Sequence, residues 1–372
     1  MKDDVAAGDL PFADCPAPLT SDVITMAHGG GGRAMARLLD DLVLRNVRSP
    51  ELSARHDSAV LDLGGALRSV APQRGAAALR DAGPRVAFTT DTYVVSPLFF
   101  PGGDIGKLAV FGTVNDLAMS GATPVALSLA LLLEEGFPLA DLDRVTRSVQ
   151  AACDEAEVRV VTGDTKVVDR GKGDGLYITT AGVGVVRPGA RVAPDRITEG
   201  DAVIVSGDIG RHGMAILGER EHLGFEPPIL SDCAPLAAAI GALLDARIDL
   251  HAARDLTRGG LGAALCELAK ASAAHLLVEE TAIPVSREVS AACELFGLDP
   301  LYVACEGRMV LFVPEPDADR ACSILRDLPV TSGATRIGAV REVGRGHVEM
   351  LTRLGGRRLV DLPSGAELPR IC

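Results

Sequence analysis

The sequence lacks an excess of positive charge, which limits the partners that the protein can attract. Its 372 residues include 37 Lys and Arg against 50 Asp and Glu, giving a formal net charge of −13 at pH 7. A field of that sign repels nucleic acid and anionic membrane surfaces. We therefore expect neither as a partner, and any bound phosphate must be held by metal ions and local backbone amides.

Paired cysteines and long apolar runs are also missing. None of the eight cysteines belongs to a Cys-x-x-Cys pair, which disfavours a structural zinc site or a thioredoxin-type motif. The longest apolar run, residues 125–133, is far shorter than the roughly 20 residues of a membrane-spanning helix. The first residues do not have the pattern of a signal peptide. These absences favour a cytoplasmic protein with reduced thiols.

Glycine, in contrast, is abundant, with 41 residues, and 47% of the chain is hydrophobic. This composition is typical of a folded protein with many tight turns or close approaches of the backbone. The length favours two domains. Because strand patterns mix with long helices without regular alternation, we predict an α+β fold. The predicted organisation is an extension at 1–22, two domains at 23–190 and 191–360, and a mobile tail at 361–372.

The usual nucleotide-binding motifs are absent. The sequence contains neither a P-loop nor a Gly-x-Gly-x-x-Gly after a strand. It does contain a run of four glycines, Gly29, Gly30, Gly31 and Gly32, followed by a predicted helix from residue 34. Backbone amides in such a run can hold phosphate oxygens. The alternative is that the run is only a flexible hinge.

Several aspartates stand at the ends of predicted elements or in apolar surroundings. Asp91 follows a predicted strand at 86–90, and Asp164 belongs to a Thr162-Gly163-Asp164 turn that we expect to interrupt a strand starting at residue 158. Asp116 lies in an apolar helix, where a charge is costly unless it is paired. Without a P-loop, carboxylates suit Mg²⁺ bridging to ATP phosphates. The predicted metal ligands are Asp57, Asp91, Asp116, Asp164 and Asp255. Alternatively, such aspartates are ordinary caps and turn residues.

The end of the sequence carries a thiol. Cys372 follows a segment with two prolines and no periodic pattern, so it can reach into a site from a mobile tail. Glu306 stands in Ala304-Cys305-Glu306-Gly307 between apolar stretches, where burial would raise its pKa into a range useful for a base. The alternatives are an accidental exposed thiol and a structural salt bridge.

Together these pieces resemble the HypE family of hydrogenase maturation proteins. The resemblance covers residues 24–372, and the tail and the Thr-Gly-Asp-Thr-Lys block are its most specific parts. The matching stretches are Ala27-His28-Gly29, Phe88-Thr89-Thr90-Asp91, Asn115-Asp116, Val161-Thr162-Gly163-Asp164-Thr165-Lys166, Arg254-Asp255-Leu256-Thr257-Arg258-Gly259-Gly260, Glu306-Gly307 and Pro369-Arg370-Ile371-Cys372.

The resemblance implies a fold, a reaction and partners. The fold is that of the aminoimidazole ribonucleotide synthetase superfamily, a homodimer built through the N-terminal sheet, with ATP and Mg²⁺ between the domains. A carbamoyl group is placed on Cys372 by HypF. ATP then drives dehydration of the S-carboxamide to an S-cyanide. The cyanide passes to iron on a HypC–HypD complex for a [NiFe]-hydrogenase.

With this resemblance in view, we predict three groups of site residues. The predicted catalytic residues are Cys372, Glu306 as the base, and Lys166 as a proton acceptor or phosphate clamp. Two histidines beside glycine turns, His28 and His212, are possible phosphate contacts, but a lone histidine is more often structural. The residues predicted to bind ATP or its phosphates are Gly29, Gly30, Gly31, Gly32, Thr90, Asn115, Thr162, Gly163, Thr165 and Arg258.

Two other functions remain open from the sequence. A selenophosphate synthetase of the same superfamily needs Cys or selenocysteine in the early glycine-rich loop, and residues 28–33 contain neither. A non-catalytic scaffold would use Cys372 only to carry a group made elsewhere. If Asp116→Ala abolished ATP hydrolysis, this result would contradict the scaffold function.

Overall fold

The computed structural model describes residues 28, 30, 32–46, 51, 56–62, 85–363, 368 and 370–372. Gly29, Gly31 and the predicted extension at 1–22 lie outside these residues. After the glycine run, the chain passes through α1 (Arg33–Leu38), the π-helical segment η2 (Leu39–Val43) and α2 (Leu44–Asn46). Within the part of the chain that the structure describes, no helix is both long and apolar enough to cross a membrane.

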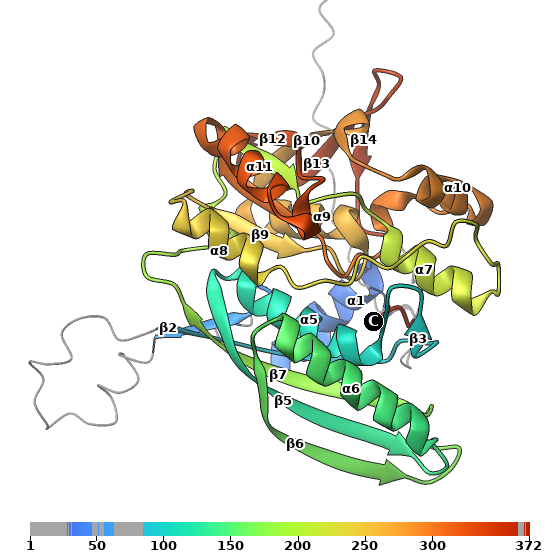
Figure 1. The fold of residues 1–372 in the computed structure, drawn as a ribbon. Helices are drawn as coiled ribbons and strands as arrows, with labels where there is room; N and C mark the ends of the chain where they lie inside the picture. Colours follow the sequence, from blue (N-terminus) through green and yellow to red (C-terminus); the bar gives the residue numbers. More distant parts are fainter. Residues whose placement is uncertain are drawn as a thin grey trace, which may run out of the picture.

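A five-stranded sheet forms the first half of the fold (Figure 1). Neighbouring strands are antiparallel except the last two, which run parallel. Buried and more exposed residues alternate in the third strand, as expected for a sheet with one covered face. The order is β1 (Ala59–Asp62), β2 (Arg85–Tyr93), β7 (Leu176–Val186), β5 (Ala122–Glu134) and β6 (Arg159–Val168).

Two helices, α5 (Ile105–Met119) and α6 (Leu139–Glu155), cover one face of this sheet (Figure 1). A hairpin of β3 (Phe99–Phe100) and β4 (Gly103–Asp104) leads into α5. The Asp104 carboxylate caps the helix, accepting hydrogen bonds from the amides of Gly106 at 2.8 Å and Lys107 at 3.0 Å.

The opposite face of the sheet carries exposed apolar side chains. Phe88, Leu132, Val183 and Val185 are each between 37% and 44% exposed. Phe88 and Val183 are paired across β2 and β7, so the apolar positions are continuous between strands.

A seven-stranded sheet forms the second half, with helices on both faces of its centre (Figure 1). One face of β8 packs with α9, and the other packs with α8 and α11. The strand order is β14 (Arg357–Val360), β13 (His347–Leu351), β10 (Ala274–Glu279), β12 (Thr335–Val343), β8 (Asp201–Val205), β11 (Met309–Pro314) and β9 (Ala252–Asp255). The helices are α7 (Arg211–Arg220), α8 (Ala237–Asp245), α9 (Gly260–Ser272), α10 (Arg287–Phe296) and α11 (Ala318–Arg326).

Helix α5 joins the two halves. It packs on β2 and β7 of the first sheet and against α8 and β9 of the second half. The Asn115 side chain connects them by hydrogen bonds, donating to Ala234 O at 3.1 Å and accepting from the Leu236 amide at 2.7 Å. Both halves combine helices with mainly antiparallel sheets, so the predicted α+β fold is confirmed.

Two local predictions about strands were wrong. β2 does not end at Asp91 but continues to Tyr93, which is buried and pairs with Ile178 of β7. β6 is not interrupted by a turn, because residues 162–164 pair with residues 128–130 of β5. A Cβ on Gly163 would lie only 2.2 Å from Leu129 O, so this glycine permits close strand pairing rather than a turn.

Candidate active site

The end of the chain runs beside residues 94–96, which directly follow β2. The Val94 amide donates to Cys372 O at 3.0 Å, and the Ser96 amide donates to Arg370 O at 3.2 Å. The Arg370 guanidinium in turn donates to Val94 O at 3.1 Å. Main-chain hydrogen bonds therefore hold the tail at a fixed register, which places Cys372 beyond the end of β2.

Helix α7 holds the tail from the other side. The Arg220 guanidinium donates to Arg370 O at 2.9 Å and also to Ser96 O, and so joins both segments. His212 Nε2 lies 2.9 Å from Ile371 O. The Ile371 side chain is 4% exposed and packs in the core that contains Tyr93 and Phe100.

The hydrogen bonds of His212 define its tautomer. Because Ile371 O can only accept, Nε2 must carry a proton, and Nδ1 then accepts from the Ser231 hydroxyl at 2.9 Å. Burial lowers the pKa of His212 to about 4. The ring is therefore neutral at pH 7, and the tail is held by a neutral hydrogen bond.

A small cavity of about 80 Å³ opens beside the docked thiol. It is lined by the tail, the end of β2, the start of α9 and part of the early glycine run. The lining residues include Gly30, Thr92, Arg258, Gly259, Ala304 and Cys372.

Cys372 is half-buried, and several charged groups lie near its thiol. Burial, followed by the nearby Glu306 carboxylate, raises the pKa of its thiol, while Arg258 acts in the opposite direction. Glu306 is 3% exposed, and its Oε1 is buried without a hydrogen-bond partner among the described residues. Burial and the negative charges of Asp255 and Asp91 raise the pKa of Glu306 well above its usual range. The docked thiol is thus a poor nucleophile next to a strongly proton-binding carboxyl group.

Four of the five predicted metal-binding aspartates gather near this site. They come from different elements: Asp57 precedes β1, Asp91 lies in β2, Asp116 in α5 and Asp255 ends β9. Burial, followed by the charges of Asp255, Asp57 and Asp91, raises the pKa of Asp116 well above its usual range. Burial and Asp57 raise the pKa of Asp255 to about 8.

Two arginines compensate only part of this negative charge. Arg254 Nε lies 2.7 Å from Asp57 Oδ1, and Arg258 Nη2 lies 3.8 Å from Asp91 Oδ1. The other Asp57 oxygen, Oδ2, is buried and has no hydrogen-bond partner among the described residues. Carboxylate oxygens are the kind of ligand that Mg²⁺ prefers, and Asp57 Oδ2 is an oxygen of this kind without a partner in the described part of the chain.

The loop from β9 to α9 positions both Asp255 and Arg258. Gly259 and Gly260 have φ angles of +78° and +60°, which a side chain would disfavour. A Cβ on Gly260 would also lie 2.7 Å from Val303 O. The two glycines therefore allow the chain to turn tightly into α9, with Arg258 directed at the cavity.

Glu306 is positioned by a second buried carboxylate. The Glu306 amide donates to Asp232 Oδ1 at 2.8 Å. A Cβ on Gly307 would lie 2.0 Å from Asp232 O, so the glycine permits this close approach. Asp232 stands in a loop without a motif, so no pattern in the sequence selects it.

Other predicted site residues lie apart from Cys372 within this chain. Lys166 and Asp164 form an exposed ion pair of 2.9 Å on β6, the edge strand, and neither lines the cavity. Thr162, Gly163 and Thr165 belong to the same exposed strand. The Thr90 hydroxyl donates to Thr180 O, and the Asn115 amide bonds to backbone groups.

The early glycine run is only partly described. Gly30 lines the cavity, and Gly32 precedes α1 as its N-cap. Of the two histidines, His212 contacts the tail, while His28 does not line the cavity. The sequence did not predict that Thr92 lines the cavity or that Arg220 contacts the tail.

Comparison with family models defines the class of protein. The chain matches "AIR synthase related protein, N-terminal domain" over residues 73–186 and "AIR synthase related protein, C-terminal domain" over residues 198–350. The fold is therefore that of an AIR synthase-related protein.

Relatives that match along nearly the whole chain show which family of AIR synthase-related proteins it belongs to. The carbamoyl dehydratase HypE of Azotobacter vinelandii is 48% identical over 354 residues, or 95% of this chain and 98% of that protein. A crystal structure of a HypE–HypF complex matches with a TM-score of 0.79 and 39% identity, covering 88% of this chain and 99% of the other. A HypE structure in complex with ATP matches with a TM-score of 0.76 and 43% identity, covering 94% and 100%. The chain belongs to the HypE family.

Proposed function

We propose that this protein uses ATP to dehydrate an S-carboxamide on Cys372 to an S-cyanide, which supplies the cyanide ligand of the [NiFe]-hydrogenase iron. The observation that carries the proposal is the docked position of Cys372 beside Glu306, Arg258 and the aspartate cluster. Family membership and the ATP-bound relative support it.

The reaction balances as a dehydration driven by phosphoryl transfer. The carboxamide oxygen attacks the γ-phosphorus of ATP, and ADP leaves. The C–O bond of the resulting phosphorylated intermediate then breaks, so the oxygen departs with phosphate. Two N–H protons leave the nitrogen as the C≡N bond forms, and the products are the S-cyanide, ADP and phosphate.

Glu306 is the base that we propose for one of these protons. Its Oε1 is buried and unpartnered, so it can accept an N–H without first losing another bond. The charges that raise the pKa of Glu306 also make its carboxylate a stronger base than an exposed one.

The aspartates and Arg258 would bind the nucleotide. Asp57, Asp91, Asp116 and Asp255 would hold Mg²⁺, which neutralises phosphate charge when bound. Arg258 provides a fixed positive charge at the cavity wall, where it can contact a phosphate oxygen. The amide of Gly30 lies at the same cavity and, with the neighbouring glycines, is our proposed phosphate contact.

The remaining predicted residues are proposed to act in a homodimer. The uncovered face of the first sheet carries a continuous apolar area, which suits a second copy of the chain. Lys166 pairs across the strands with Leu132 of that face, and Asp164 and Thr162 share it. We propose that Lys166 and its neighbours reach a nucleotide through this dimer, with Lys166 as base or phosphate clamp.

The proposed partners follow from the family. HypF would place the carbamoyl group on Cys372, as the HypE–HypF structure supports. A HypC–HypD complex would accept the cyanide, in the cytoplasm. Neither alternative from the sequence suits the docked tail: a selenophosphate synthetase has no use for Cys372, and a passive carrier has no use for the buried acidic cluster.

The intact mass of the protein tests the proposal. After incubation with HypF, carbamoyl phosphate and Mg-ATP, we expect a gain of one carbamoyl group, followed by loss of one water. Cys372→Ser should show neither change. No adduct on Cys372 would contradict the proposal and indicate a free small-molecule substrate instead.

A further inference from the structure

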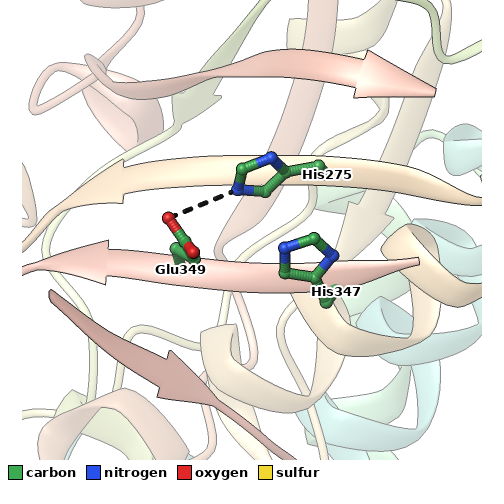
Figure 2. A group of neighbouring side chains, drawn as sticks. All are labelled: His275, His347 and Glu349. Carbon is green, nitrogen blue, oxygen red and sulfur yellow. Dashed lines mark ion pairs between the residues drawn. The ribbon is translucent and has the colours of Figure 1, made fainter. Parts of the chain in front are cut away.

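Three metal-binding side chains gather on the second sheet, away from the cavity at Cys372 (Figure 2). The parallel pairing of β10 and β13 sets His275 opposite His347, and Glu349 lies two residues further on the same face. The two imidazole rings stack with centroids 4.1 Å apart, and His275 Nε2 is 3.5 Å from Glu349 Oε2. One candidate ligand atom from each residue lies within 4.8 Å of the others.

The surroundings leave a nitrogen lone pair free on each ring. His347 Nδ1 lies 3.0 Å from Arg345 O, which can only accept, so Nδ1 carries the proton and Nε2 has the lone pair. His275 Nδ1 faces Glu342 Oε1 of β12 at 3.9 Å, while its Nε2 is buried without a hydrogen-bond partner among the described residues. Outer groups of this kind, a carboxylate and a carbonyl, orient histidine ligands in metal sites.

One cation competes for the carboxylate. Arg357 Nη1 donates to Glu349 Oε2 at 3.1 Å, but its side chain is 63% exposed and can move to solvent at little cost. The second Glu349 oxygen remains available, and Glu342 adds a further negative charge at the edge of the group.

We propose that His275, His347 and Glu349 bind a divalent transition-metal ion of the Zn²⁺ type. Two imidazoles with one carboxylate suit Zn²⁺, Co²⁺ or Ni²⁺, whereas Mg²⁺ and Ca²⁺ prefer oxygen ligands. Ligand bonds of about 2.0–2.2 Å require the three ligand atoms to approach to about 3.3 Å, a small side-chain adjustment. The side chains of His275 and Glu349 are 14% and 24% exposed, so the ion can enter and retain water.

The ion would join two strands that are far apart in the sequence. β10 ends at Glu279 and β13 begins at His347, so residues 280–346 lie between them, and β13 and β14 form the end of the sheet. An ion that binds the folded state alone stabilises it by RT ln(1 + c/Kd), where c is the free ion concentration, so the stabilisation grows with the logarithm of this concentration once it exceeds the Kd. The site would therefore strengthen the end of the sheet without contacting the reacting group.

Metal binding by the full-length protein tests the proposal directly. Competition with a chromophoric chelator should reveal one Zn²⁺ per chain that excess Mg²⁺ does not displace. His347→Ala and Glu349→Gln should each weaken binding at least tenfold, since even outer-shell changes cost about 10- to 100-fold. The exposed His222→Ala is the matched control and should bind as the wild type does. Wild-type affinity in both site variants would overturn the proposal.

Spectroscopy and stability separate this site from the cysteines. Co²⁺ should give weak d–d bands without the charge-transfer band of a thiolate ligand, and a thiolate band in the one-to-one complex would overturn the assignment. Zn²⁺ should raise the Tm of the wild type and of His222→Ala, but not that of Glu349→Gln, whose near-identical shape preserves the fold. An equal rise in all three proteins would also count against the site.

Discussion

At the scale of single residues, the buried carboxyl groups decide what the site can do. Asp116, Asp255 and Glu306 all have raised pKa values because each is buried and each lies near other carboxylates, Asp91 in all three cases. Buried carboxylates that are all ionised repel one another, which is unfavourable. Binding of a cation, or of a proton taken from the substrate, relieves this repulsion. The same charges keep the Cys372 thiol protonated while it is docked.

The role of Glu306 can be isolated by Glu306→Gln. This change preserves shape but removes the base, so dehydration of carbamoylated Cys372 should slow by about 10²- to 10⁴-fold. Loading by HypF should continue, because it does not require this base. Rapid-quench mass spectrometry would measure both steps, with the exposed Glu294→Gln as the control. Full dehydration activity in Glu306→Gln would refute its role.

His212 should make stability depend on pH. Its pKa is lowered to about 4 in the folded protein and is about 6.5 when unfolded. The unfolded chain therefore binds more protons between these values, so the contribution of His212 is complete above pH 6.5 and is lost as the pH falls towards 4. This linkage amounts to about 3 kcal/mol at most.

Urea denaturation at several pH values would test this linkage. The difference in free energy of unfolding between wild type and His212→Gln should change by up to about 3 kcal/mol between pH 7 and pH 4, in favour of the variant at low pH. A difference that does not vary with pH would show that His212 does not titrate in this range.

At the scale of elements, the tail is the part whose structure was hardest to predict from the sequence. Its two prolines and lack of periodicity indicate no helix or strand. Its docked form depends on hydrogen bonds to Val94 and Ser96 and on helix α7, all at least 150 residues away in the chain. Local patterns carry no information about such distant partners, so the thiol could be predicted but its binding groove could not.

Ile371 should be the main hydrophobic contribution to docking. Ile371→Ala removes a buried side chain, which typically costs 2–5 kcal/mol when the site cannot close up. The docked population should fall and dehydration should slow at least tenfold, while loading by HypF should not slow. Leu354→Ala, at a residue that is 98% exposed, is the control. Equal slowing of both steps would instead indicate general damage to the fold.

The strand predictions show a related limit. Residues 162–164 have turn-like composition, yet they pair within β6 because Gly163 must pass close to Leu129 O. Asp116 was predictable, since a charge in an apolar helix implies a special role. Asp232 was not predictable, because only the folded structure shows that its carboxylate accepts a hydrogen bond from the Glu306 amide.

At the scale of the whole molecule, the two halves differ in what covers their sheets. Helices cover both faces at the centre of the second sheet, whereas the described helices that pack on the first sheet lie on one of its faces (Figure 1). The α+β class followed from the mixture of elements, and the general plan followed from the family resemblance. The relative placement of the aspartates required the fold, because they come from four separate elements.

The uncovered face should support the proposed dimer. Val183 is 39% exposed on the central strand β7, and Val183→Asp would place a charge within a buried interface. We expect light scattering after size exclusion to show a dimer for the wild type and a monomer for this variant. Leu354→Asp should remain dimeric. A wild-type monomer, or a dimeric Val183→Asp, would contradict the use of this face.

The docked tail, which carries the reacting thiol, has a consequence for how the output of the protein is counted. Because the reacting group is part of the polypeptide, its local concentration is set by the tether and not by a metabolite pool. Each chain then makes one product molecule and stops until that product is taken away. In this respect the protein behaves as a reagent that is reloaded, so the supply of product should follow the number of chains and the rate at which an acceptor empties them.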